Sequence, residues 1–158
     1  MEQTTGKYRS KKLFDGYSAC FRQWKAVDTH CRFLHGYAIS FEVEFEGELD
    51  ARNWVFDFGG MKRAKNKIKG FSPKDYFDWL LDHTVIISND DPFKEDFILL
   101  DSKGIIQLRI LDFVGCERFA EHLFIEINKF LEVETRGRVE AIKVTVFENK
   151  KNSASFIK

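Results

Sequence analysis

The feature that most constrains the fold is a strict alternation over residues 37–46. Every second side chain there is aromatic or aliphatic, and most of those between are acidic. The apolar set comprises Tyr37, Ile39, Phe41, Val43 and Phe45. A period of two places such a set on one face of a strand. One apolar face and one polar face predict a half-buried strand of an antiparallel sheet.

Composition narrows the class of protein. A chain of 158 residues fits one domain, and 44% apolar with 32% charged residues is ordinary for a globular protein. The formal net charge of +0 gives no reason to expect a nucleic-acid or membrane partner. No apolar run approaches the roughly 20 residues of a membrane helix. Three cysteines without paired spacing, and no signal peptide, favour a cytoplasmic protein.

Patterns on either side of this alternation predict the other elements. The expected strands are 8–23 with a bend at Gly16, 36–46 paired with it as a hairpin, a strand end at 55–58, and strands at 107–111, 142–148 and 153–157. A helix that starts at Ser72 and Pro73 is expected to end at Asp82-His83, because Ser72 and Pro73 have the chemistry of an N-cap and a first helical residue. A shorter helix is expected at 92–100, and residues 115–131 form the clearest helix because their apolar side chains share one face.

The main elements follow the order β-β-α-α-β-β. Strands at both ends with helices between them predict an α+β fold, an antiparallel sheet with its helices on one face. We expect one domain over residues 1–158, in which residues 1–7 are loose.

Cys31 and His35 are the first candidates for chemistry. A thiol becomes a base or nucleophile when a neighbouring cation or imidazole lowers its pKa from about 8.5. A partly buried cysteine beside a hydrogen-bonded histidine at a strand start explains the same spacing, and short motifs alone do not decide between the two.

The other candidate site residues also have both a functional and a structural explanation when each is considered alone. Asp82 could orient His83 for proton transfer, or His83 could simply stabilise a helix C-terminus. Glu117 lies in the first turn of a helix, and Glu148 follows a strand where it could accept two N–H groups from a flat heterocycle. The lysine-rich run at 62–69 is expected to be a solvated face, with a phosphate contact as the alternative. His122 is expected at the surface of its helix.

In order, the pieces are Cys31-x3-His35-Gly36, a strand, Val55-Phe56-Asp57-Phe58, Leu81-Asp82-His83, Cys116 to Ala120, and a strand ending in Glu148. This series resembles the 6-pyruvoyl-tetrahydropterin synthase family. Its most similar branch is the 6-carboxy-tetrahydropterin synthases of queuosine-precursor synthesis. The resemblance covers residues 14–156.

The resemblance implies a tunnelling fold: a four-stranded antiparallel sheet with two main helices on one face. Subunits would join edge to edge into a hexamer or another trimer-based homo-oligomer, with active sites between subunits. By position, Cys31 resembles the catalytic thiol, Asp82 and His83 the proton-relay dyad, and Glu148 the pterin anchor. Glu117 and Asp57 match positions near the pocket. Residues 86–112 are longer than the family's loop, which suggests a lid or an altered interface.

The metal site departs from the family. The resemblance implies zinc held by three histidines, but Phe21 and Tyr37 stand at two of those positions and only His35 remains. Phenylalanine cannot ligate a metal, and such a site needs about three protein ligands. His30 and Cys20 are candidates for a relocated ligand.

Three functions follow as expectations. The first is a lyase acting on 7,8-dihydroneopterin triphosphate, with Cys31 as base, the Asp82–His83 pair as relay and Glu148 as anchor. The second is a non-catalytic or zinc-free protein that binds a pterin or purine on the same scaffold. The third is an unrelated redox or interaction protein that uses Cys31.

Overall fold

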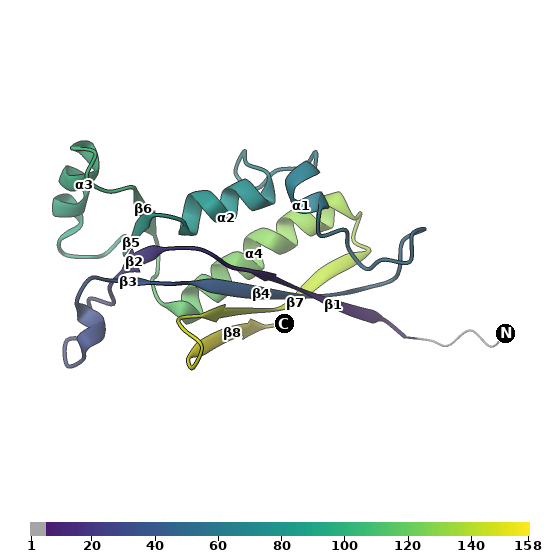
Figure 1. Ribbon diagram of the computed structural model, residues 1–158, viewed down its shortest axis with the longest axis horizontal. Coiled ribbons are helices and arrows are strands. Elements are labelled where there is room, and N and C mark those ends of the chain that lie inside the picture. Colours follow the sequence, from purple (N-terminus) through teal and green to yellow (C-terminus); the bar gives the residue numbers. More distant parts are fainter. Residues whose placement is uncertain (1–5) are drawn as a thin grey trace.

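The computed structural model describes residues 6–158. Its main sheet is antiparallel and has the order β1-β4-β7-β8, and helices α2 and α4 cover one face of it (Figure 1). The bounds are β1 (Tyr8–Phe14), β4 (Ser40–Gly47), β7 (Val139–Phe147), β8 (Ser153–Ile157), α2 (Pro73–Leu81) and α4 (Cys116–Glu134). The predicted α+β class, with a four-stranded antiparallel sheet and two main helices on one face, is confirmed.

The alternating strand folds as predicted on its core side. β1 and β4 pair antiparallel from Tyr8 opposite Gly47 to Phe14 opposite Phe41. The alternating apolar side chains from residue 39 to residue 45 are at most 1% exposed. The period of two therefore fixed both the strand and the face that it buries.

Both predicted long strands are broken, which corrects their lengths. The first leaves the main sheet after Phe14 through Gly16, whose φ is +82°, and resumes as β2 (Ala19–Phe21). The second divides into β3 (His35–Tyr37) and β4. The detached pieces β2 and β3 pair with each other, because both chains turn away from the main sheet at the same end.

A second sheet, which the sequence did not predict, has the order β3-β2-β5-β6. Its strand β5 (Thr84–Ser88) lies parallel to both β2 and β6 (Leu108–Leu111). Helix α3 (Lys94–Ser102) connects β5 to β6, so the expected long insertion at 86–112 is a strand–helix–strand unit that begins at Thr84. The helix and strand expected at 92–100 and 107–111 are both present, with small shifts in their bounds.

The expected strand end at 55–58 is wrong. These residues form a turn that leads into the short helix α1 (Gly60–Arg63). Phe56 is nonetheless buried, because its ring packs 5.3 Å from that of Phe45 and 6.4 Å from that of Phe130. The apolar run thus reflects burial in the core. Of the residues expected to be loose, 1–5 lie outside the described residues, and 6 and 7 precede β1.

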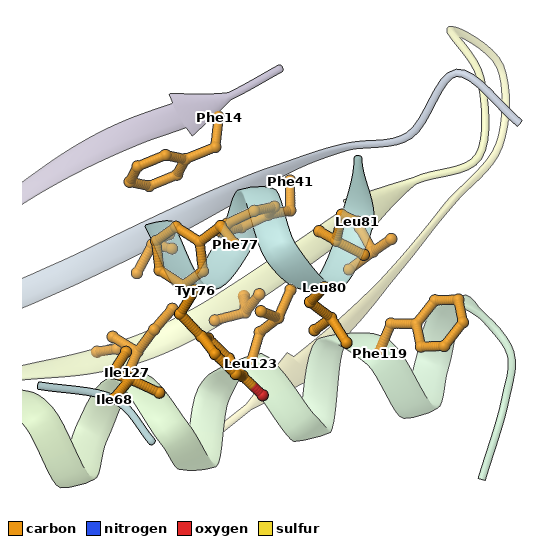
Figure 2. Close-up of a cluster of buried hydrophobic side chains, with 14 of the residues drawn as sticks. Phe14, Phe41, Ile68, Tyr76, Phe77, Leu80, Leu81, Phe119, Leu123 and Ile127 are labelled. Atoms are coloured by element: carbon orange, nitrogen blue, oxygen red, sulfur yellow. The ribbon is translucent and has the colours of Figure 1, made fainter. Parts of the chain in front are cut away.

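Aromatic rings join the sheet to α2. Phe14, Phe41 and Phe77 lie with ring centroids 4.8–5.0 Å apart (Figure 2). The predicted helix start is confirmed, since the Ser72 hydroxyl accepts a hydrogen bond from the backbone N–H of Asp75. No helix within residues 6–158 is both long and apolar enough to span a membrane.

His122, expected at the surface of its helix, is half-buried. Its Nε2 lies 2.6 Å from the hydroxyl of Tyr76, a side chain that is 1% exposed. Burial lowers the pKa of His122, so the pair is a neutral hydrogen bond between α2 and α4.

Candidate functional site

A cavity of about 250 Å³ lies where β2, β3, the start of α4 and the β7–β8 turn meet. It is lined by three of the predicted site residues, Cys31, Glu117 and Glu148. Its other lining residues are Phe21, Gln23, Tyr37, Cys116, Asn152, Ser153 and Ala154. The three predicted residues come from distant parts of the sequence, so only the fold brings them together.

Backbone hydrogen bonds fix the position of Cys31. It lies in the single-turn 3-10 helix η1 (His30–Arg32), where its N–H donates to the Thr29 hydroxyl at 3.2 Å. Its carbonyl accepts from the N–H of Gln23 at 2.8 Å. The loop that carries the thiol is thereby tied to the chain that follows β2, at the wall of the cavity.

A closed turn presents Glu148. Its N–H donates to the carbonyl of Asn152 at 3.0 Å. The side-chain oxygen of Asn149 accepts from the N–H groups of Lys151 and Asn152 at 2.8 and 2.9 Å. This arrangement is the Asx-type turn that asparagine favours. It holds the carboxylate at the end of β7, where an acceptor of paired N–H groups was predicted.

Sequence reasoning missed Cys116 as a member of the cavity. Burial, followed by the charges of Glu148 and Glu117, raises the pKa of the Cys116 thiol to about 12. The thiol therefore stays protonated at neutral pH and is a poor base or nucleophile. Of the two thiols in the cavity, Cys31 is the candidate for chemistry.

Gln23 was also missed, and the glycine before α4 is the signal that could have found it. Gly115 has a φ of +129°, a conformation that favours glycine. A Cβ at this position would lie 2.8 Å from Nε2 of Gln23. Gly115 thus lets the Gln23 amide lie against the start of α4, beside the carboxylate of Glu117.

The Asp82–His83 pair lies outside the cavity. The two side chains are in contact, with His83 Nδ1 3.1 Å from Asp82 Oδ1, and the His83 side chain is 77% exposed. His83 has a φ of +56°, which is uncommon for a residue other than glycine. Such a conformation is retained where the surroundings over-determine it, often at functional sites. Neither Asp82 nor His83 lines the cavity that contains Cys31, so within one chain the dyad and the thiol do not share a pocket.

Asp57 is also separate from the Cys31 cavity. It lines a larger cavity of about 490 Å³ between β1 and residues 49–59. Its carboxylate lies 3.3 Å from the guanidinium of Arg52 and 3.1 Å from that of Arg63. Burial opposes ionisation, but the Arg52 hydrogen bond and the Arg63 charge hold the pKa of Asp57 below its usual value. In this chain Asp57 acts as the centre of an ion-pair cluster.

The residues present do not fit a zinc site of three imidazoles. Phe21 lies opposite His35 in the β2–β3 pairing, and its ring stacks 4.2 Å from that of Tyr37. The Tyr37 hydroxyl lies 2.7 Å from Nε2 of His35, so a hydrogen bond engages that nitrogen. Phenylalanine offers no donor atom, and biological zinc takes imidazole, thiolate or carboxylate ligands.

The proposed replacement ligands do not assemble either. Within residues 6–158, no three histidine, cysteine, aspartate or glutamate side chains are grouped closely enough to hold a metal ion. His30 and Cys20 therefore join no such group.

The fold and this cavity define an α+β protein in which a thiol and two carboxylates line one small cavity. The family model for 6-pyruvoyl tetrahydropterin synthase matches residues 11–158. The chain belongs to this family.

Relatives and solved structures agree with that membership. A candidate 6-carboxy-5,6,7,8-tetrahydropterin synthase of Pyrococcus abyssi is 26% identical over 132 residues, which are 80% of this chain and 76% of the relative. An uncharacterized protein from Wolinella succinogenes matches with a TM-score of 0.77 and 21% identity, covering 98% of this chain and 99% of that one. The 6-pyruvoyl tetrahydropterin synthase of Caenorhabditis elegans matches with a TM-score of 0.62 and 16% identity, covering 99% of each chain. These structures share the fold.

Proposed function

We propose that the chain is a 6-carboxy- or 6-pyruvoyl-tetrahydropterin synthase-like lyase acting on 7,8-dihydroneopterin triphosphate. In the 6-carboxy branch, its product would supply 7-deazaguanine and queuosine synthesis. Family membership and the names of the Pyrococcus relatives support the reaction class. The observation that carries the proposal is the meeting of Cys31, Glu117 and Glu148 in one cavity.

Each residue has a defined part in this reaction. The Glu148 carboxylate accepts two N–H groups from the edge of the pterin ring, which anchors the ring by charge-assisted hydrogen bonds. The Cys31 thiolate removes a proton from the substrate side chain as a general base. The electron pair left behind expels the triphosphate oxygen and breaks a carbon–oxygen bond. The Asp82–His83 pair transfers the second proton.

A neighbouring copy of the chain would complete this site. The volume of the cavity is slightly below about 300 Å³, the lower end of the range for small-molecule sites. The dyad that the reaction needs lies exposed elsewhere on the chain. We propose a homo-oligomer, a hexamer or another trimer-based assembly, in which the dyad of one subunit faces the cavity of the next. The main sheet has open edges at β1 and β8 through which copies could pair.

The aromatic stack at Phe21, His35 and Tyr37 supports a second candidate. A zinc-free protein that binds a pterin or purine would keep Glu148 but lack the Lewis acid that polarises a substrate oxygen. Turnover of 7,8-dihydroneopterin triphosphate by purified protein separates the two candidates, since binding without product favours the second.

Glu148→Gln is expected to weaken binding of 7,8-dihydroneopterin ten- to hundredfold. A hydrogen bond to a charged group contributes about 1.5–3 kcal/mol, and the amide replaces one acceptor by a donor. Fluorescence titration measures this affinity. The matched control is Glu140→Gln, on strand β7, which Glu148 directly follows, but paired with Lys158 and outside the lining of the cavity. Equal affinities of the two variants would remove Glu148 from the anchor role.

A further inference from the structure

Strand β1 carries a lysine on the face that packs against the core. Its residues Ser10, Lys12 and Phe14 lie opposite Phe45, Val43 and Phe41 of β4, which are fully buried. The other face holds Arg9 and Lys11, which form ion pairs with acidic residues of β4. Arg9 and Lys11 are thus explained by cross-strand charge pairing. Lys12 is not, since a core-facing position normally takes an apolar side chain.

The side of β1 that carries Lys12 opens into a cavity of about 420 Å³ beneath α1 and α2. Cationic side chains line it from three separate elements: Lys12 from β1, Lys62 and Arg63 from α1, and Lys74 from α2. Tyr17 and Asp15 also line the cavity. The lysine-rich run at 62–69 was expected to be a solvated face, and two of its residues, Lys62 and Arg63, line this cavity.

Lys74 also occupies a position that its helix disfavours. It lies in the first turn of α2, where the helix dipole favours negative charge. Its ammonium pairs with Asp78, one turn further on. Two cations placed against local preference, on different elements, thus line the same cavity. Such conflicts between local preference and placement are expected at functional sites.

The cavity keeps an excess of positive charge after its ion pairs are counted. Arg63 pairs with Asp57 at 3.1 Å, and Lys74 pairs with Asp78. Lys12 and Lys62 form no ion pair with any residue in the range 6–158, and the single carboxylate in the lining is Asp15. The unpaired ammonium groups favour an anion with several oxygens, which they could contact from opposite walls.

We propose that this cavity binds a polyphosphate group. The identity of this group rests on the proposed function, in which it is the triphosphate of the substrate. The cavity lies beside the exposed dyad: Tyr17 lines it, and the carbonyl of the next residue, Ser18, accepts a hydrogen bond at 3.4 Å from the N–H of Thr84, which directly follows His83. The subunit that presents Asp82 and His83 to a neighbour's thiol would therefore also present these cations to the leaving group.

Binding of inorganic tripolyphosphate to the full-length protein, measured by isothermal titration calorimetry at fixed ionic strength, tests the proposal. Lys12→Gln is expected to raise the Kd about tenfold, because it removes one charge-assisted contact. Lys62→Gln, on a different element, should raise the Kd by a similar factor. This second variant keeps the test valid if the Lys12 variant does not fold. Lys11→Gln is the control, since it removes the same charge from the same strand but on the outward face.

The outcomes separate this proposal from the lyase assignment. Weaker binding in the Lys12 and Lys62 variants, with the Lys11 variant equal to wild type, supports the site even if the pterin substrate is not turned over. If wild type binds no tripolyphosphate, or all three variants bind alike, the site is overturned, even if the lyase activity is present.

Discussion

Replacing Cys31 by alanine is expected to lower kcat for 7,8-dihydroneopterin triphosphate about a thousandfold, with a much smaller change in affinity for the pterin ring. Removal of a positioned general base typically costs 10²–10⁴-fold in rate. Glu148, which anchors the ring in our proposal, remains in place in this variant. Product formation under single-turnover conditions, followed by chromatography, measures the effect.

Cys20→Ala is the matched control for this substitution. Cys20 lies in β2 and packs against the small cluster of Val85, Ile87 and Phe97, away from the cavity. Its replacement should leave kcat within about threefold of wild type, the range expected for a small change away from the reacting groups. If both alanine variants keep wild-type rates, Cys31 is not the base and the proposed mechanism is wrong.

The second large effect concerns metal binding. Purified wild-type protein is expected to retain no stoichiometric zinc at the His35 position, whereas Phe21→His combined with Tyr37→His should hold about one zinc ion per chain. The positions already converge, since the ring of Tyr37 lies 4.2 Å from that of Phe21 and 4.1 Å from that of His35. The double variant supplies three imidazoles and frees Nε2 of His35 from its hydrogen bond.

Elemental analysis after dialysis against a weak chelator measures the zinc content of the wild-type protein and of the double variant directly, without reference to activity. The single variants, with two imidazoles each, are the controls and should lose their zinc, because a stable site needs three protein ligands. A wild-type protein that keeps one zinc ion per chain would contradict the view that the aromatic stack replaces the metal.

The parts of the fold that the sequence predicted are those with a clear period. The alternation at 37–46 and the apolar faces of the two main helices each have one dominant pattern. Strand β5 was missed because all five of its residues are buried, so it has no alternation to detect. The second sheet was missed because its parallel pairs depend on contacts between distant segments, which local patterns do not encode.

The site was predictable only in part, for the same reason. Cys31 and Glu148 were candidates from their local sequence, and the resemblance supplied their roles. Their meeting in one cavity depends on the turn at residues 149–152. Cys116 belonged to a segment that carries the resemblance but was given no role in the site, and the one signal for Gln23 was the glycine at position 115, which lies far from it in the sequence. The exposed position of His83, away from the thiol, follows from the left-handed turn after α2, which the sequence indicated only as a helix end.

Subunit mixing tests most directly the central claim that two copies of the chain share each site. Cys31→Ala and His83→Ala proteins would each be purified, combined in equal amounts and allowed to exchange subunits. If thiol and dyad act from different subunits, about a quarter of the mixed sites regain both groups by chance pairing, and turnover returns to that fraction of wild type. No recovery, with exchange verified by mass spectrometry, would contradict the account.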